Sequence, residues 1–591
     1  MANRINAHDM EIIFIGLTHE SCATMQMTAS GKSYSGCHAT AFPNALPPLF
    51  LLFKSVRRIV HLFPLDSQIV EEHDAAIPVM RTTILTQLIM ASLLPFAAIH
   101  STLGQDSALG QFDGHTDVGS PKIPGSASYD PASGTYTLSG GGANIWSTND
   151  EFQFLWKKMK GDFIVRARVE FVGAGVEPHR KIGWMARASL DPNAPYVDAV
   201  EHGVGLTSLQ YRQFSGSNTD QIILSISNAD IIQFERRGNN YTFSAAHAGQ
   251  TFVSTNFSDI TLPEDVFVGL FLCAHNPEVK EKAIFHDMQI IRPAKTNFIP
   301  YKDYIGSVLH IADVQSGKME TIYSSAQPFE APNWTRDGKA LIYNISGRGE
   351  GWGELVRFDL ATGERTVINT DFANKNNNDH VLSFDGKMLA ISDQSEGHGG
   401  QSSIFTVSIS GGTPKPVTTK SPSYCHGWSP DGKFLVYTGG RNKKFDVYKI
   451  PAGGGEEIRL TDSNGLNDGP EYTPDGKYIY FNSSRTGRMQ LWRMKPDGTG
   501  QEQVTDDDYN NWFPHISPDG KWIAFISFPK DIDPDSHPYY KECYIRLMPI
   551  EGGTPRVIAY IYGGQGSMNV PSWSPDSKKI AFVSNTDMSG Q

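Results

Sequence analysis

The segment GWSPDGKFLVY at residues 427–437 is one of six similar copies in the second half of the chain. The others are NWTRDGKALIY (333–343), VLSFDGKMLAI (381–391), EYTPDGKYIYF (471–481), HISPDGKWIAF (515–525) and SWSPDSKKIAF (572–582). Their turn aspartates are spaced by 48, 46, 44, 44 and 57 residues. An Asp-Gly pair between apolar runs favours a hairpin, because Gly takes the positive φ that the turn requires. Each copy therefore predicts two antiparallel strands.

A second kind of hairpin, with turns such as GGG or PDGTG, follows each of the first five copies. It is expected near residues 354–369, 402–418, 444–461, 490–505 and 543–559. A sixth hairpin of this kind, at 308–323, precedes the first copy. Six hairpins of each kind, offset by one, predict six four-stranded blades, with 308–323 completing the last blade and closing the ring. The sequence predicts an all-β chain with a six-bladed β-propeller at 304–591.

The words WSPDGK (428–433) and PEYTPDGKYIYFNSSRTG (470–487) resemble the TolB-type, WD-like repeats of bacterial periplasmic propellers. The resemblance covers 304–591 and implies recognition of a glycan or of a cell-envelope protein at the propeller channel mouth. TolB itself carries a small α/β domain before its propeller, and this chain has a different segment there, so the resemblance does not imply a role in the Tol system. Oligogalacturonate lyases also look similar, with a related propeller of seven blades and a histidine-held metal.

Residues 105–292 alternate short apolar runs with turns rich in Gly, Asn, Asp and Ser, which predicts an antiparallel β-sandwich. The words GGANIWSTNDEFQFLW (141–156) and KIGWMARASLDPNAP (181–195) resemble the concanavalin A-like jelly-roll domains of bacterial glycan-handling proteins. Large aromatic residues of this segment can stack on a sugar ring or fill the core, and both alternatives stay open for Trp146, Trp156, Trp184 and Tyr211. Residues 293–303, with two prolines and no pattern, are the expected linker.

Residues 80–104 read MRTTILTQLIMASLLPFAAIHSTLG, a basic start, an apolar run and small residues that are typical of a secretory signal. We expect Met80 to be the true start and 1–79 to be upstream sequence; a real extension with a membrane-anchoring segment is the alternative. The protein is then exported, to the periplasm or beyond the cell, and does not span a membrane after cleavage. Only three cysteines follow, so disulfides are not its framework.

The charge balance excludes one class of partner. The chain has 51 Lys and Arg against 63 Asp and Glu, a net charge of −12, and no basic run, so a nucleic-acid partner is not expected. It has no phosphate-cradling Gly loop, GxSxG or HExxH motif, and no nucleotide or organic cofactor is predicted. The expected partner is a carbohydrate or a cell-envelope protein.

A metal site is the sharpest chemical hypothesis. The segments that enter the innermost strands lie just before the Asp-Gly-Lys turns, where propellers place their ligands. His380 and His426 stand five residues before their turn aspartates, and Glu471 and His515 stand four before theirs. Imidazole and carboxylate ligands suit Zn²⁺ or Mn²⁺. The alternative is that these side chains bond neighbouring loops around a wet, metal-free channel.

Further ligand-binding candidates lie in the same segments and in nearby loops. Asp379 and Asp468 are expected to orient the histidines, and Gln565 and Asn569 to supply amide oxygens. The remaining candidates, with aromatic residues for a sugar-stacking rim and arginines as bases, are Asn333, Trp352, Tyr424, Arg441, Arg485 and Trp512. With a metal, a lyase acting on an acidic polysaccharide or oligosaccharide is the alternative function, its catalytic base unassigned.

A weak calcium signal lies in the insertion that lengthens the last spacing. Asp531, Asp533 and Asp535 alternate there as at the start of a Ca²⁺ loop, but the Gly and distal Glu of an EF-hand are missing. An acidic surface loop is the alternative and the more ordinary reading of Asp-Ile-Asp-Pro-Asp.

Overall fold

The computed structural model describes residues 109–347, 349–395 and 400–589. The predicted upstream extension (1–79) and signal segment (80–104) lie outside the described residues. Within these ranges, no helix combines the length and the apolar character needed to cross a membrane.

Residues 114–291 form two seven-stranded antiparallel sheets. The first has the order β1 (Gly114–Val118), β6 (Phe152–Lys160), β15 (Asp265–Cys273), β8 (Lys181–Arg187), β9 (Tyr196–His202), β10 (Leu206–Arg212) and β11 (Asp220–Ser227). The second has the order β14 (Val253–Phe257), β13 (Asn240–Ala246), β12 (Ile231–Arg237), β7 (Phe163–Phe171), β16 (Glu281–Ile291), β3 (Thr135–Gly140) and β2 (Ser126–Asp130). A short hairpin joins β4 (Ile145–Trp146) to β5 (Asn149–Asp150).

One apolar core joins the two sheets into a sandwich. Leu155 and Trp184 of the first sheet lie in the same buried cluster as Phe234 and Phe285 of the second. Trp184 is fully buried, so its ring serves the core and is not available to a sugar. Antiparallel pairing throughout agrees with the predicted sandwich; its concanavalin A-like identity stays a prediction.

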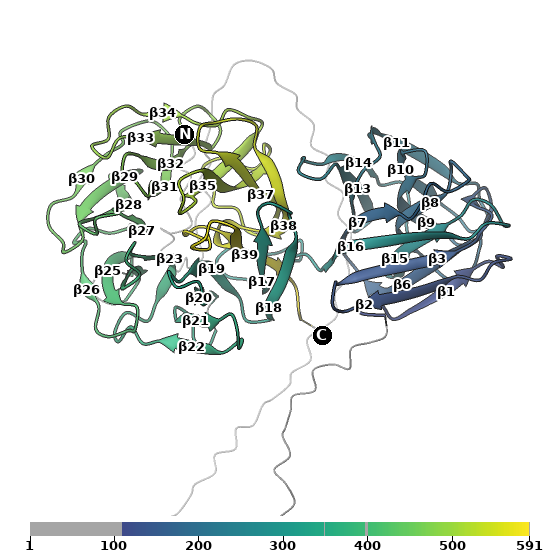
Figure 1. Ribbon diagram of the computed structural model, residues 1–591, viewed down its shortest axis with the longest axis horizontal. Coiled ribbons are helices and arrows are strands. Elements are labelled where there is room, and N and C mark those ends of the chain that lie inside the picture. The colour runs from purple at the N-terminus through teal and green to yellow at the C-terminus, as the bar shows by residue number, and fades with distance from the viewer. Residues whose placement is uncertain (1–108, 348, 396–399, 590–591) are drawn as a thin grey trace, which may run out of the picture. The chain divides into compact units, whose positions relative to one another are not determined.

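The second half of the described chain is a six-bladed propeller, and the blades form a ring with the first strand of each nearest the centre (Figure 1). Blades 1 and 2 are β19 (Phe329–Trp334), β20 (Ala340–Ile345), β21 (Leu355–Asp359), β22 (Arg365–Ile368) and β23 (Asn376–Leu382), β24 (Met388–Asp393), β25 (Ser403–Ser408), β26 (Lys415–Pro416). Blades 3 and 4 are β27 (Ser423–Trp428), β28 (Phe434–Arg441), β29 (Lys444–Pro451), β30 (Ile458–Arg459) and β31 (Asn467–Tyr472), β32 (Ile479–Ser483), β33 (Gln490–Met494), β34 (Glu502–Gln503). Blade 5 is β35 (Tyr509–Ile516), β36 (Trp522–Pro529), β37 (Lys541–Pro549) and β38 (Arg556–Gly563).

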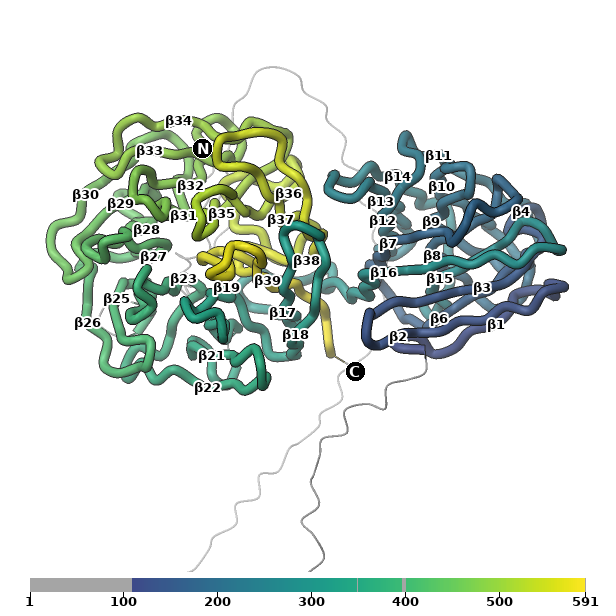
Figure 2. The backbone as a smooth tube through the Cα atoms, in the orientation of Figure 1, coloured from purple at the N-terminus to yellow at the C-terminus, as the bar shows by residue number. Residues whose placement is uncertain are grey.

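Blade 6 is built from both ends of the propeller segment. Its sheet has the order β18 (Met319–Ser325), β17 (Gly306–Asp313) and β39 (Lys579–Thr586), and Trp573 adds an isolated bridge to Ile580 at the inner edge. Gly306 pairs with Thr586 and Asp313 with Lys579. Figure 2 shows the teal start of the propeller beside its yellow end. The predicted closure of the ring by the first hairpin is confirmed.

The Asp-Gly-Lys turns share one set of hydrogen bonds. In the copy at 427–437, the Ser429 hydroxyl donates to Asp431 at 2.6 Å, and the backbone N–H of Lys433 donates to the same carboxylate oxygen at 3.1 Å. These bonds lower the pKa of Asp431. The glycine after the aspartate has a φ of +69° in this turn, and Ser577 takes the same region at +62° in the sixth copy. The turn geometry expected from the Asp-Gly pair is therefore present.

The innermost strands carry a recurring β-bulge that the repeat does not reveal. Pairing with the second strand shifts register between Glu330 and Asn333 in blade 1, and at the corresponding place in blades 2 to 5. Ala331, Gly469 and Phe513 occupy matching positions there with φ of +60°, +61° and +53°. A bulge re-aims the side chains around it. The bulge lies between two parts of each inner strand: the start of the strand, and the regularly paired part nearer the turn.

Candidate functional site

A group of ionisable and amide side chains, which we call the mouth cluster, lies where the innermost strands begin: Asp379, His426, Asp468, His537 and Asn569. We call this end of the channel the mouth and the opposite end the turn end. His426 is the centre of the cluster. Its Nε2 lies 3.2 Å from Asp468 Oδ1 and 3.8 Å from Asp379 Oδ1. Its Nδ1 lies 3.4 Å from the carbonyl oxygen of Asn569.

Both nitrogens of His426 face acceptors, so the geometry fits a doubly protonated imidazolium. Burial works against the charged ring, but Asp468 and Asp379 outweigh it and raise the pKa of His426. The ring also stacks on Phe513, with centroids 5.8 Å apart. The inner strand of blade 3 therefore places an imidazole whose charged form is favoured between carboxyl groups from blades 2 and 4.

Asp468 is the ionised acid of the cluster. Its Oδ1 accepts hydrogen bonds from the Thr438 hydroxyl at 2.6 Å and the Gly469 backbone N–H at 2.8 Å. Its Oδ2 lies 3.1 Å from His537 Nε2. Burial opposes ionisation, but the bonds from the two histidines outweigh it and hold the pKa of Asp468 well below its usual range.

Asp379 differs from Asp468 because it has fewer donors. The Asn569 side-chain amide donates to its Oδ1 at 3.0 Å. Burial, together with the charge of Asp468, raises the pKa of Asp379 to about 6 although His426 opposes the shift. The Oδ1 of Asn569 is buried without a hydrogen-bond partner among the described residues. The cluster thus contains two carboxyl groups of different protonation behaviour and an amide oxygen open to a donor.

Glu330 extends the cluster into blade 1. Its Oε2 accepts a hydrogen bond from the Asn378 side chain at 3.0 Å, and burial raises the pKa of Glu330 to about 7. The short helix η1 (Gln565–Ser567) brings Gly566 against this carboxyl group, where a Cβ atom would lie 2.3 Å from Glu330 Cδ. A glycine is needed there because the helix backbone approaches the acid so closely.

The four predicted metal ligands are not gathered at one point. His515 Nδ1 lies 2.7 Å from Glu471 Oε2, and its Nε2 lies 3.2 Å from the Met568 carbonyl oxygen. His380 instead approaches the Ile342 carbonyl oxygen at 3.2 Å, and burial lowers its pKa to about 4. His426 belongs to the mouth cluster. In the part of the chain that the structure describes, no three His, Cys, Asp or Glu side chains are arranged to hold a metal ion. A bound Zn²⁺ or Mn²⁺ stays a prediction.

The other predicted ligand-binding residues divide into two groups. Asp379, Asp468 and Asn569 are brought together in the mouth cluster, and Gln565 lies in the adjacent helix η1. Trp352 is half-buried in the connection between β20 and β21, and Tyr424 is half-buried in β27.

The predicted residues of the second group make contacts that stabilise the blades. Trp512 is fully buried in an apolar cluster, so the prediction that it forms a sugar-stacking rim is wrong. Arg441 pairs with Glu457 at 2.9 Å, and Arg485 stacks over Trp492 at 4.5 Å. Asn333 accepts a bond from the Leu382 backbone N–H at 3.1 Å, joining blades 1 and 2.

The sequence analysis missed His537, Glu330 and Asn378. His537 lies in the connection 530–540 between β36 and β37. In the sequence this insertion is indicated only by the spacing of 57 residues between the last two turn aspartates. His537 reaches the Asp468 carboxylate from outside the repeat. In the same insertion Asp531, Asp533 and Asp535 are exposed, and the Ser484 hydroxyl donates to Asp535 at 2.5 Å. This fits the surface-loop alternative to a calcium site.

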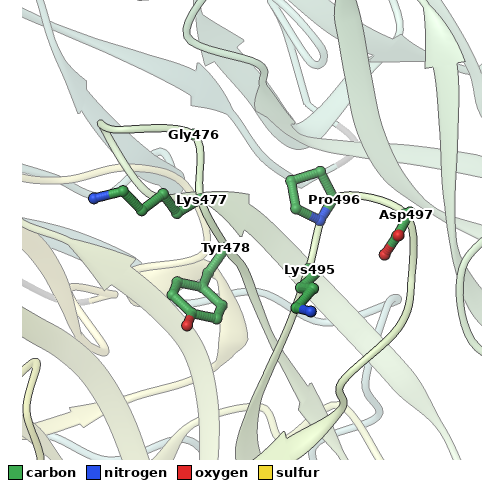
Figure 3. A pocket seen from close by; sticks show the side chains of 6 residues that line it. All are labelled: Gly476, Lys477, Tyr478, Lys495, Pro496 and Asp497. Carbon is green, nitrogen blue, oxygen red and sulfur yellow. The ribbon is translucent and has the colours of Figure 1, made fainter.

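A separate hollow on the outside of blade 4 is lined by Gly476, Lys477, Tyr478, Lys495, Pro496 and Asp497 (Figure 3). The figure shows the Lys477 side chain extending away from Lys495 and Asp497. Its ammonium group lies 2.9 Å from Asp475, which neutralises it. The hollow does not bring its charges together, and it is not part of the candidate site.

Comparisons with known proteins found relatives of the propeller segment. A family model described as the TolB beta propeller domain matches residues 423–533. The uncharacterized protein Atu1656 of Agrobacterium fabrum is 44% identical over 278 residues, which are 47% of this chain and 92% of that protein. The solved "putative TolB" of Agrobacterium tumefaciens is 42% identical and covers 48% of this chain and all of its own, with a TM-score of 0.45. TolB from Acinetobacter baumannii is 22% identical over 42% of this chain and 65% of its own, with a TM-score of 0.34.

Proposed function

The chain belongs to the TolB-like β-propeller family, and from this premise we propose that it is an exported recognition protein that binds a cell-envelope protein at the channel mouth. Export rests on the signal-like segment 80–104 and on the periplasmic character of TolB-type propellers. The class of partner follows from the chemistry of the mouth.

The mouth cluster is the observation that supports binding. Side chains from blades 2, 3, 4 and 6, with His537 from the insertion of blade 5, meet at one end of the channel. Buried ionisable groups are costly unless paired, and a propeller needs none of them to close its ring. Their concentration at the place where the inner strands begin is therefore better explained by a binding role than by stability.

The composition of the cluster favours a basic or donor-rich group on the partner. Asp379 and Asp468 lie beside the imidazoles of His426 and His537, and the Glu330 carboxyl group, bonded to Asn378, adds a third acid next to them. The unpartnered Oδ1 of Asn569 accepts one further hydrogen bond. His537 is the most exposed member, with 23% of its side chain accessible, so a partner contacts it first. A lysine or arginine side chain of a partner protein supplies both the charge and the donors.

A glycan is the second candidate, and it rests on the sandwich domain, which we propose to be concanavalin A-like. Tyr211 is half-buried and stacks on Phe257 at 3.8 Å between centroids, and Trp146 holds the Lys181 ammonium over its ring at 5.3 Å. Aromatic faces of this kind accept sugars. The metal-dependent lyase is a weaker candidate, because His515 pairs with Glu471, His426 lies beside Asp468 and His380 approaches a backbone carbonyl oxygen, so the four side chains do not meet.

The test is capture from a detergent-solubilised envelope fraction by the full chain, beside Asp379→Asn, His537→Gln and the control Lys477→Gln on the outside of blade 4. We expect one protein to be retained by the wild type and the control, with recovery at least about tenfold lower for the two mouth variants and falling as salt rises. A glycan array on the same preparations tests the second candidate. Equal recovery by all four proteins, or sugar binding without protein capture, contradicts the proposal.

A further inference from the structure

A second site lies at the turn end of the channel, opposite the mouth. A cavity of 40 Å³ there is lined by residues of all six blades, most of them apolar: Val381, Leu382, Trp428, Ile516, Pro518 and Pro571 among others. Arg336, Trp334 and Glu471 also line it. The volume is well below the roughly 300 Å³ of an ordinary small-molecule pocket, so only the end of a molecule fits.

Arg336 breaks the pattern of the repeat. It stands immediately before the turn aspartate, where four blades have proline (Pro430, Pro474, Pro518 and Pro575) and one has Phe384. A residue that departs from a local rule without a structural gain points to function. Arg336 is thus the only charged residue at this position of the six turns, and it lines the cavity described above, which we call the axial cavity.

The Arg336 guanidinium has few partners. Its Nε donates to the Ser383 carbonyl oxygen at 3.3 Å, and the group stacks over Phe384 at 5.1 Å. Among the described residues, no carboxylate lies within ion-pair distance of it. Several other propeller arginines do have a carboxylate partner, as Arg546 has in Asp507 at 2.8 Å. Burial lowers the pKa of Arg336, and the charge of Glu471 opposes this shift only in part.

Trp334 offers a second donor in the same cavity. Trp428 and Trp573, at the matching position of blades 3 and 6, donate their indole N–H to carbonyl oxygens of the preceding blade at 2.9 and 3.0 Å. The indole N–H of Trp334 is buried without a partner. A buried donor of this kind calls for an acceptor.

Glu471 does not neutralise Arg336. Its Oε1 accepts the Ile516 backbone N–H at 3.0 Å, and its Oε2 faces His515, both of whose nitrogens lie near acceptors. Glu471 is therefore held by His515 and Ile516 and makes no ion pair with Arg336, although its charge favours the charged guanidinium from a distance.

We propose that the axial cavity binds the carboxylate end of an organic molecule or peptide chain, with Arg336 holding the carboxylate and the apolar walls holding the stem. A planar guanidinium matches a carboxylate through two parallel hydrogen bonds. The site is independent of the mouth cluster and of the proposed function.

The test is fluorine NMR of the full chain labelled with 5-fluorotryptophan, in which Trp334→Phe identifies one resonance. Butyrate and an N-acetylated tripeptide acid are the probes, the two sources of a carboxylate. The C-terminal amide of the same tripeptide and inorganic phosphate are the comparison ligands. We expect a saturable shift of the Trp334 resonance with a carboxylate, and binding at least about tenfold weaker to the amide.

The variants are Arg336→Gln, Arg336→Pro, which restores the residue of the other turns, and the charge-matched control Lys339→Gln, an exposed neighbour. Both Arg336 variants are expected to lose the shift and Lys339→Gln to keep it, with thermal unfolding confirming the fold. No shift with either carboxylate, equal binding of the amide, preference for phosphate, or full binding by Arg336→Gln would each overturn the proposal. The comparison of acid with amide uses the wild type alone, so it stands even where a variant fails to fold.

Discussion

At the level of single residues, the hydrogen-bond donors around a buried carboxyl group, rather than its residue type, decide the chemistry of the mouth. Asp379 and Asp468 are both buried aspartates beside His426, yet the pKa of one is raised and that of the other is lowered. The difference follows from the number of donors, because Asp468 has two histidines, a hydroxyl and a backbone N–H while Asp379 has one amide and a distant imidazole. The positions of these residues in the sequence predict none of these contacts.

The unfolding free energy of Glu330→Gln tests whether the surroundings of a carboxyl group set its pKa in this way. The pKa of Glu330 is raised to about 7 from its ordinary value of 4.5, so the folded state holds the proton more tightly than the unfolded state. The contribution of Glu330 to the stability of the wild type is therefore lost as the pH rises from about 4.5 to 7, and the glutamine variant lacks this one pH-dependent contribution. We expect the variant to match the wild type at pH 4 and to exceed it by about 1–3 kcal/mol at pH 8 in urea unfolding.

The matched control is Glu320→Gln, on exposed β18. Its unfolding free energy should follow the wild type at both pH values. A Glu330→Gln variant that is less stable than the wild type at pH 8 would show that the buried acid is ionised and satisfied there.

At the scale of elements, the inner strand is a regular ladder near the turn and a bulge near the mouth. The Asp-Gly-Lys repeat predicts the ladder because its turn chemistry is local: one hydroxyl, one carboxylate and one glycine within a few residues. In blades 1, 4 and 5 the bulge contains a residue with positive φ followed by proline, and the positive-φ residues differ: Ala331, Gly469 and Phe513. Because the positive-φ residue is not shared and the proline is missing in blades 2 and 3, the repeat does not predict the bulge.

Gly469→Ala tests the packing of the bulge. A Cβ atom at this position would lie 2.7 Å from Asn482 Oδ1 and 2.8 Å from Phe513 Cδ1. We expect destabilisation by about 1–3 kcal/mol in chemical unfolding, because the strand must shift to relieve the contact.

Ala331→Gly is the control at the matching position of blade 1, where an alanine is already accommodated at a φ of +60°. It should change the unfolding free energy by less than about 1 kcal/mol, since relief of strain and added chain entropy oppose each other. Equal effects of the two substitutions would mean that backbone strain, rather than the contacts of Gly469, sets the cost.

At the scale of the whole molecule, the sequence predicts the propeller well and the site only in part. Six repeats fix the blade number, and the offset of the two hairpin types fixes the closure through β17 and β39. Only part of the site could be predicted, because equivalent positions of the repeat do not make equivalent contacts. His380 and His426 stand at the same distance from their turns, yet His380 turns to a backbone carbonyl. His537 lies outside the repeat altogether.

Ring closure predicts a strong asymmetry between two proline substitutions. Ile311 lies in β17, which pairs with β18 on one side and β39 on the other, while Val367 lies in the outermost strand β22. Ile311→Pro is expected to cost more than about 3 kcal/mol and to open the ring, and Val367→Pro to cost clearly less. Chemical unfolding and limited proteolysis measure the difference, and similar costs would argue against closure by the first hairpin.

Site-specific photo-crosslinking in the living bacterium tests recognition at the mouth. A photoreactive aromatic residue replaces Trp352, in the connection between β20 and β21 at the mouth, or Lys339, in a turn at the opposite end. We expect a discrete crosslinked product with an envelope protein from position 352, lost in Asp379→Asn, and none from position 339. No product from 352, or the same product from both positions, would contradict it.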